Sequence, residues 1–102
     1  MKISEQVPSK QLANNIIEGI QDKNGKEIIL LELKNVENSI CDFFVICHGT
    51  STTHVDAISE SVEKKTKEKL KEKPYRKEGQ KNLTWVLMDY EDVVVHIFQE
   101  EY

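Results

Sequence analysis

The sequence has few of the features that define membrane, disulfide-rich or basic nucleic-acid-binding proteins. Its 102 residues include only two cysteines, two prolines and four glycines, and acidic residues outnumber basic ones by 18 to 14. The net charge of −4 argues against long-range attraction of the whole molecule to nucleic acid or anionic lipid. No stretch approaches the ~20 apolar residues of a membrane span. We therefore expect no membrane association and no direct sequence-specific binding of nucleic acid.

The two cysteines, Cys41 and Cys47, lie six positions apart in an apolar stretch. In an extended chain both would point to the same face about 20 Å apart, which is too far for a disulfide. Buried free thiols are typical of a reducing compartment, and the N-terminus shows neither a signal-peptide pattern nor an Arg-rich leader. These features predict a cytoplasmic protein.

The spacing of apolar residues predicts one compact domain over residues 9–102, preceded by a flexible leader at residues 1–8. Ser9 is the expected N-cap of the first helix. The expected elements are a helix over 9–23, strands over 27–33 and 42–48, a helix over 51–73, and strands over 83–90 and 93–99.

This order, αββαββ, predicts an α/β fold in which helices flank a mixed β-sheet. The strand at 42–48 is apolar at nearly every position, which predicts cover on both faces. Because only Glu91 and Asp92 separate the last two strands, we expect these to form an antiparallel hairpin.

The junction "CHGTSTTH" joins the second strand to the second helix, and it allows two interpretations. Gly49, Thr50 and Ser51 could present backbone N–H groups to a phosphate at the helix N-terminus. Alternatively, Gly49 relieves a tight turn while Thr50 or Ser51 caps the helix. The lysine of a P-loop is absent, so the motif alone does not establish a phosphate site.

Carboxylates at the predicted hairpin also allow two interpretations. Asp89 and Glu91 could hold Mg²⁺, which would suit a nucleotide-dependent transferase, or with Asp92 they could simply form the turn. In nucleotidyltransferases an Asp-x-Asp follows a Gly-Ser turn by about ten residues, whereas here that distance falls on Ser-Glu-Ser in a helix. The remaining His, Cys and Asp residues show no metal-ligand spacing. We expect no metal and no cofactor.

The single tryptophan, Trp85, lies in the middle of a predicted strand with Leu83, Leu87 and Asp89 on the same face, and Tyr90 follows at the tip. A lone tryptophan is usually a core residue. It is also the residue type most enriched at interface hot spots, so both roles stay open.

Three segments together resemble the ribosome silencing factor family, also called RsfS or Iojap. They are "CDFFVICHGTSTTHVDAISESV", the pair Glu78-Gly79, and "TWVLMDYEDVVVHIFQEE". The resemblance covers residues 9–102. The matching signature positions are Gly49, Thr50, Ser51 and His54 in the turn, and Trp85, Asp89, Asp92 and His96 in the hairpin.

The resemblance implies a nucleotidyltransferase-like fold without the catalytic carboxylates, and a protein that is not an enzyme. It implies binding to ribosomal protein uL14 of the large (50S) subunit. This binding blocks joining of the small subunit and represses translation under nutrient limitation. A homodimer is also possible. Trp85 matches an interface tryptophan, and Asp89, Tyr90, Asp92 and His96 are the further candidates for partner binding.

Several positions depart from the family pattern. The family usually has threonine at the position of His48, arginine at Thr53 and glycine at Glu91. It also usually continues beyond Glu100-Glu101 with an arginine and a further helix. The departures at His48, Thr53 and Glu91 give the strand-to-helix turn less support as a ligand site.

Overall fold

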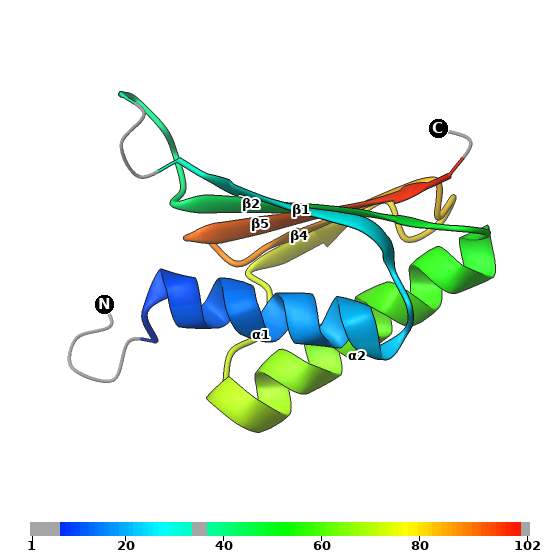
Figure 1. Cartoon of the computed structure of the whole chain (residues 1–102), viewed down its shortest axis with the longest axis horizontal. Helices are drawn as coiled ribbons and strands as arrows, with labels where there is room; N and C mark the ends of the chain where they lie inside the picture. The colour runs from blue at the N-terminus through cyan, green and yellow to red at the C-terminus, as the bar shows by residue number, and fades with distance from the viewer. Residues whose placement is uncertain (1–6, 34–36, 101–102) are drawn as a thin grey trace.

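A computed structural model describes residues 7–33 and 37–100 (Figure 1). Six residues of the expected leader, and residues 101–102 of the expected domain, lie outside this part. The elements are α1 (Ser9–Asp22), β1 (Lys26–Glu32), β2 (Phe43–Gly49), α2 (Thr52–Leu70), β3 (Arg76–Glu78), β4 (Trp85–Asp89) and β5 (Val93–Gln99).

The strands form one five-stranded sheet in the order β1-β2-β5-β4-β3. β2 and β5 pair in parallel at the centre, and the other neighbours are antiparallel. This arrangement confirms the predicted single α/β domain with a mixed sheet, and the pairing of β4 with β5 confirms the predicted hairpin. The short strand β3 was not predicted, because its sequence Arg-Lys-Glu has no strand pattern of its own and depends on pairing with β4.

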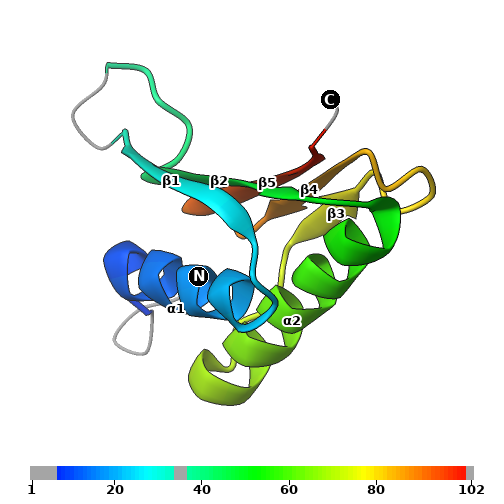
Figure 2. The same cartoon turned by 45° about the vertical axis from the view of Figure 1, so that its right-hand side comes forward.

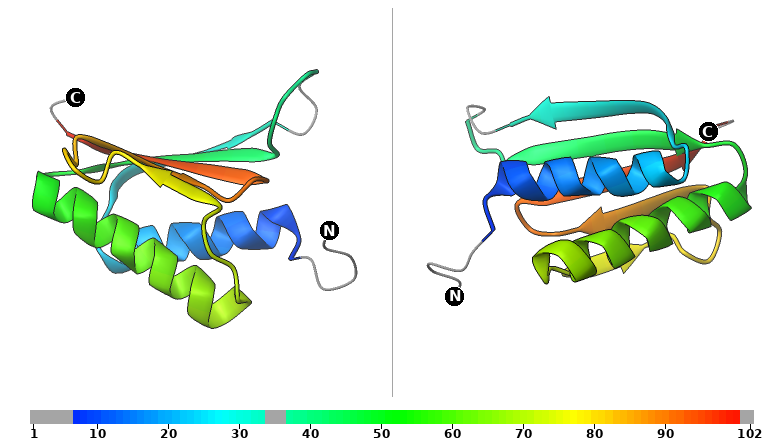
Figure 3. Two further views of the ribbon diagram at one scale, coloured as in Figure 1. Left: turned by 180° about the vertical axis from the view of Figure 1, so that it is seen from behind. Right: turned by 60° about the horizontal axis from the view of Figure 1, so that its bottom comes forward.

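Both helices pack against the same face of the sheet, as the views in Figures 1 to 3 agree. The core between the two layers is built from apolar side chains of α1, α2 and every second strand residue. Its largest fully buried members are Phe43, Ile16, Ile20, Ile58, Met88 and Ile97.

The prediction that β2 is covered on both faces is therefore wrong. Phe43, Val45 and Cys47 are buried, while the residues that alternate with them are only half-buried. The near-continuous apolar pattern of this strand indicates an apolar surface on its uncovered side, rather than a second layer of helices.

The ends of the helices differ from the prediction in two places. The N-cap position of α1 is Pro8 rather than Ser9, and no side chain caps it; Ser9 is the first helical residue, largely buried. α2 ends at Leu70, three residues before the expected end, because Lys71 adopts the left-handed conformation with φ of +58°. Neither helix of the described part is long and apolar enough to cross a membrane.

Candidate functional site

The face of the sheet that carries no helix presents a continuous set of apolar and aromatic side chains. Strand register places these residues on the side of the sheet opposite those that pack against α1 and α2. We call this surface the open face, and its residues are Ile29, Leu31, Phe44, Ile46, His48, Trp85, Leu87, Asp89, Val94, His96 and Phe98.

Three large side chains of the open face are much more exposed than core residues. Trp85 is 51% exposed, Ile29 48% and Leu31 41%. Contiguous exposed apolar surface of this kind usually marks an interaction site. The sequence motifs indicated Trp85, Asp89 and His96, but not the apolar residues of β1, β2 and β5 that share the open face with them. The sequence does not show which positions of β2 and β5 are exposed, because both sides of these strands are apolar.

Aromatic rings from β2, β4 and β5 form an ordered cluster on the open face. The Trp85 ring is stacked on Phe98 with centroids 5.7 Å apart and on His96 with centroids 6.0 Å apart. Phe44 meets the His96 ring edge-on at 5.0 Å. Nε1 of Trp85 donates a hydrogen bond to Nδ1 of His96 over 3.3 Å. These contacts fix the orientation of a half-exposed indole.

The hydrogen bond also fixes the protonation state of His96. Because Nδ1 accepts a hydrogen bond from Trp85, the neutral ring carries its proton on Nε2. Burial lowers the pKa of His96, which favours this neutral form. Nε2 is itself buried and has no hydrogen-bond partner within the described residues.

Asp89 and Asp92 hold the hairpin turn. One carboxylate oxygen of Asp89 accepts a hydrogen bond from the backbone N–H of Glu91 at 2.8 Å, and the other lies 3.8 Å from Nη2 of Arg76. The backbone carbonyl of Asp92 accepts hydrogen bonds from the N–H groups of Asp42 at 2.8 Å and Phe43 at 3.2 Å. Asp92 therefore ties the start of β2 to the hairpin, and Asp89 also belongs to the open face.

Tyr90 does not lie with the other candidates. Its side chain is 7% exposed, and its hydroxyl forms a hydrogen bond of 2.9 Å with the hydroxyl of Thr66 in α2. Leu83 is also displaced from the face it was expected to share with Trp85. It has a φ of +60° and packs against the core. We therefore exclude Tyr90 and Leu83 from the candidate site.

The turn after β2 uses its own polar groups. Oγ of Ser51 accepts a hydrogen bond from the N–H of His54 at 3.1 Å, which confirms the predicted cap of α2. The N–H of Thr50 donates to Nδ1 of His54 at 2.9 Å, so Nε2 of His54 donates to the carbonyl of Lys23 at 2.6 Å. His54 thus joins the start of α2 to the end of α1.

Gly49 is required by close packing in this turn. A Cβ at this position would lie 2.9 Å from Cγ2 of Val55. Since the N–H of Thr50 is already bound to His54, it is not free to hold a phosphate. The turn is a connection between a strand and a helix.

The two halves of the possible transferase site lie at opposite ends of the sheet. Asp89 pairs with Val94 of β5, which pairs with Phe44 near the start of β2. Gly49 is five residues further along β2, or about 17 Å away. The described residues also contain no group of three His, Cys, Asp or Glu side chains placed to hold a metal ion. Gly49 to Ser51 and Asp89 with Glu91 cannot form one nucleotide site in this fold.

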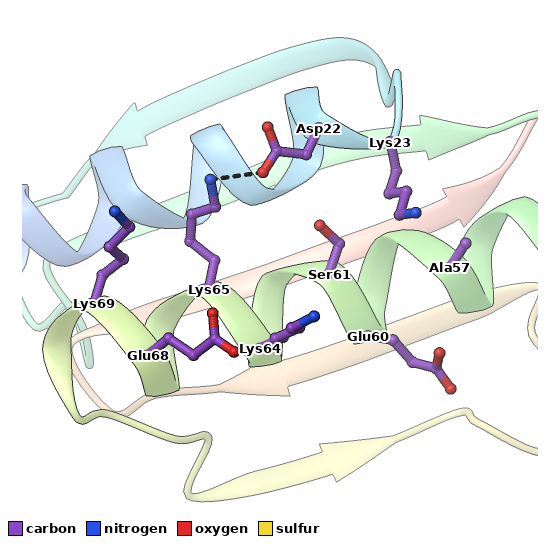
Figure 4. A pocket seen from close by; sticks show the side chains of 9 residues that line it. All are labelled: Asp22, Lys23, Ala57, Glu60, Ser61, Lys64, Lys65, Glu68 and Lys69. Carbon is purple, nitrogen blue, oxygen red and sulfur yellow. Dashed lines mark ion pairs between the residues drawn. The ribbon is translucent and has the colours of Figure 1, made fainter.

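A groove between the two helices lies on the side of the molecule away from the open face (Figure 4). Its residues carry both signs of charge, and Lys65 forms an ion pair of 2.6 Å with Asp22. This hydrogen-bonded ion pair raises the pKa of Lys65. None of the candidate residues from the sequence lines the groove, and we do not assign it a binding role.

Comparison with known proteins agrees with the sequence motifs. Residues 6–102 match the family model described as "Ribosomal silencing factor during starvation". The chain is 36% identical to ribosomal silencing factor RsfS of Halalkalibacterium halodurans over 93 residues, covering 91% of this chain and 78% of the relative. It is 35% identical to RsfS of Bacillus subtilis over 81 residues, or 78% and 66% of the two chains.

Solved structures show the same fold. A crystal structure of a protein from Chromobacterium violaceum matches with a TM-score of 0.85 and 31% identity, covering 91% of this chain and 76% of that one. A crystal structure from Bacillus halodurans matches with a TM-score of 0.81 and 34% identity, covering 90% and 84%. The chain therefore belongs to the family of ribosomal silencing factors.

Proposed function

We propose that this protein is a non-enzymatic repressor of translation that acts in the cytoplasm. Through its open face it binds ribosomal protein uL14 of the large (50S) subunit, and the bound domain sterically blocks joining of the small subunit when nutrients are limited. The observation that carries the proposal is the uncovered apolar face that includes the half-exposed Trp85, in a chain that belongs to the silencing factor family.

The geometry of Trp85 suits an interface anchor. Tryptophan side chains often contribute most to binding at the centre of an interface. Immobilising a flexible side chain on binding lowers affinity, and stacking on Phe98 and His96 has already restricted this one. The open face therefore offers a large apolar contact at a low entropic cost.

Charge supports a basic partner. The chain has a net charge of −4, and ribosomal proteins are generally basic. Opposite charges at the edge of an interface raise the rate of association, while the buried aromatic contact sets the rate of dissociation. We expect a moderate decrease in affinity with rising salt, less than for a protein that binds phosphates directly.

The test is co-sedimentation of the chain with purified large subunits. Trp85→Ala should weaken binding by at least about thirtyfold, since a hot-spot residue contributes about 2 kcal/mol or more. Its circular dichroism spectrum should remain native, because half of the side chain is exposed. Lys64→Ala, on the exposed side of α2, is the matched control and should bind normally. Unchanged binding by Trp85→Ala would refute the proposed interface.

Two further measurements identify the partner and the effect. Isolated uL14 should bind the wild-type chain and compete with large subunits for it. Addition of the chain to a mixture of large and small subunits should reduce the amount of joined ribosome, and Trp85→Ala should not. Joining that is unaffected by saturating wild-type protein would contradict the blocking mechanism.

A homodimer through the open face is a second candidate assembly. The observation that favours it is the exposure of Ile29, Leu31 and Trp85 on one surface, which two copies could bury against each other. Sedimentation equilibrium would then show a dimer that Trp85→Ala dissociates and that added uL14 displaces. A wild-type monomer at all concentrations would exclude this assembly.

A further inference from the structure

A small hollow lies at the end of the open face, beside the β4–β5 turn. It is lined by Ile40, Cys41, Tyr75, Asp89, Glu91 and Val94, which we call the edge socket. Its volume of about 150 Å³ suits one side chain rather than a segment of folded chain. The hollow is continuous with the open face, because Asp89 and Val94 belong to both and pair across β4 and β5.

The apolar part of the edge socket is unusually exposed. Ile40 is 90% exposed and Tyr75 is 80% exposed, whereas Cys41 and Val94 are buried. The backbone N–H of Tyr75 donates to the carbonyl of Asp89 at 2.6 Å, which fixes Tyr75 beside the turn. The socket thus offers apolar contact next to two carboxylates.

The two carboxylates differ in what they already bind. One oxygen of Asp89 accepts from the N–H of Glu91, and the other lies 3.8 Å from Arg76. Glu91 is exposed, and within the described part of the chain no cation pairs with its carboxylate. The socket therefore has an available negative charge at Glu91, beside one that is partly compensated.

The backbone at Glu91 is in a conformation that favours glycine. Its φ is +78°, in the left-handed region, where a side chain is strained. The turn would form more easily with glycine at this position.

We propose that the edge socket binds a single lysine or arginine side chain of the protein that covers the open face. The aliphatic part of such a side chain would pack against Ile40 and Tyr75, while its charged end would meet Glu91 and Asp89. The Tyr75 ring adds a favourable contact for a cation. This inference rests on the proposed function and adds to it a charged specificity contact at the edge of the apolar interface.

The experiment measures the affinity of the full chain for purified large subunits at low and high salt. Glu91→Gln keeps the size of the side chain and removes its charge, so affinity should fall about tenfold at low salt, with a weaker salt dependence than wild type. Glu60→Gln, an exposed change on α2, is the matched control and should behave as wild type. Tyr75→Ala should also weaken binding.

Glu91→Gly separates binding from stability. Because glycine suits φ of +78°, this variant should unfold at the same temperature as wild type or a higher one, yet bind large subunits as weakly as Glu91→Gln. A Glu91→Lys variant should lose binding to isolated uL14. A lysine-to-glutamate or arginine-to-glutamate change in uL14 should restore that binding.

The outcomes distinguish the socket from the interface as a whole. If Trp85→Ala loses binding while Glu91→Gln, Glu91→Gly and Tyr75→Ala all bind as wild type, the edge socket has no role and the proposed function stands. If the wild-type chain does not bind large subunits, both proposals fail. Reduced binding by the socket variants with unchanged Glu60→Gln supports the inference.

Discussion

The indole N–H of Trp85 donates a hydrogen bond to Nδ1 of His96, and the two rings lie within 14° of parallel. The two residues come from adjacent antiparallel strands, β4 and β5, so the sheet itself sets their separation. A tryptophan that is half-exposed would ordinarily sample several rotamers. Here the neutral imidazole and the Phe98 ring restrict its orientation, which prepares the open face for a partner.

Protonation of His96 should disrupt this arrangement. Burial lowers the pKa of His96 below the ordinary value of about 6.5, so the ring is neutral at pH 7 and becomes charged only at lower pH. Because Trp85 is the only tryptophan, its fluorescence reports the contact directly. We expect constant emission near neutral pH and a change with a midpoint below about 6.5. Large-subunit affinity should fall over the same range.

The same titration has a consequence for stability. In the unfolded chain His96 has the higher pKa, so it binds protons more readily than in the fold. The free energy of unfolding should therefore decrease as pH falls below about 6.5 and level off below the folded pKa. His96→Asn removes the titrating ring and should abolish the fluorescence change, while His48→Gln should retain it. A midpoint above 6.5 in the wild type would contradict the assigned protonation state.

His54→Ala should destabilise the fold without affecting the open face. The change removes the acceptor for the N–H of Thr50 in the turn. It also removes the donor to the carbonyl of Lys23, and this hydrogen bond joins the start of α2 to the end of α1. We expect a loss of about 1–2 kcal/mol in urea denaturation. Trp85 fluorescence and large-subunit affinity at 20 °C or below should match the wild type. Strongly reduced affinity of the folded variant would instead place His54 in the binding site.

The sequence predicted the elements of this fold well where a strong local pattern exists. Strand β5 has the predicted bounds, and the cap of α2 is Ser51, one of the two predicted candidates, because each depends on a local preference. The strand β3 was missed, since three charged residues become a strand only by pairing with β4. The proposed relation of the fold to nucleotidyltransferases stays a prediction.

The candidate site was predictable only in part, for a related reason. Family resemblance identified Trp85, Asp89 and His96, but periodicity did not distinguish an apolar face that packs on helices from one that is exposed. The sequence also made Tyr90 a candidate for partner binding, because the residue lies at the tip of a predicted strand beside a polar turn. In the fold, Tyr90 points toward α2, where Thr66 supplies a partner for its hydroxyl. That partner is 24 residues away in sequence, so no local signal indicates it.

Thr66→Val measures how much the buried hydrogen bond between the hydroxyls of Thr66 and Tyr90 contributes to stability. The change leaves the Tyr90 hydroxyl buried without its partner, which should destabilise the protein by about 1–3 kcal/mol. The double variant Thr66→Val/Tyr90→Phe removes both groups and should recover part of the loss in a double-mutant cycle. Burial raises the pKa of Tyr90, so its hydroxyl stays protonated both in the wild type and in Thr66→Val. The double variant should bind large subunits normally; weakened binding would return Tyr90 to the interface.

Gly79→Ala should affect stability and the open face together. Gly79 has a φ of +88°, and a Cβ there would lie 1.9 Å from the carbonyl oxygen of Trp85. Either the loop or the start of β4 must therefore move, and we expect a loss of at least about 2 kcal/mol in unfolding free energy. Since the clash falls on the backbone of Trp85, its fluorescence spectrum should shift even in the folded state, and large-subunit affinity should decrease. Gln80→Ala, an exposed neighbour in the same loop, should change none of these. A Gly79→Ala protein with wild-type stability, emission and affinity would show that this close contact between the loop and Trp85 does not control the binding face.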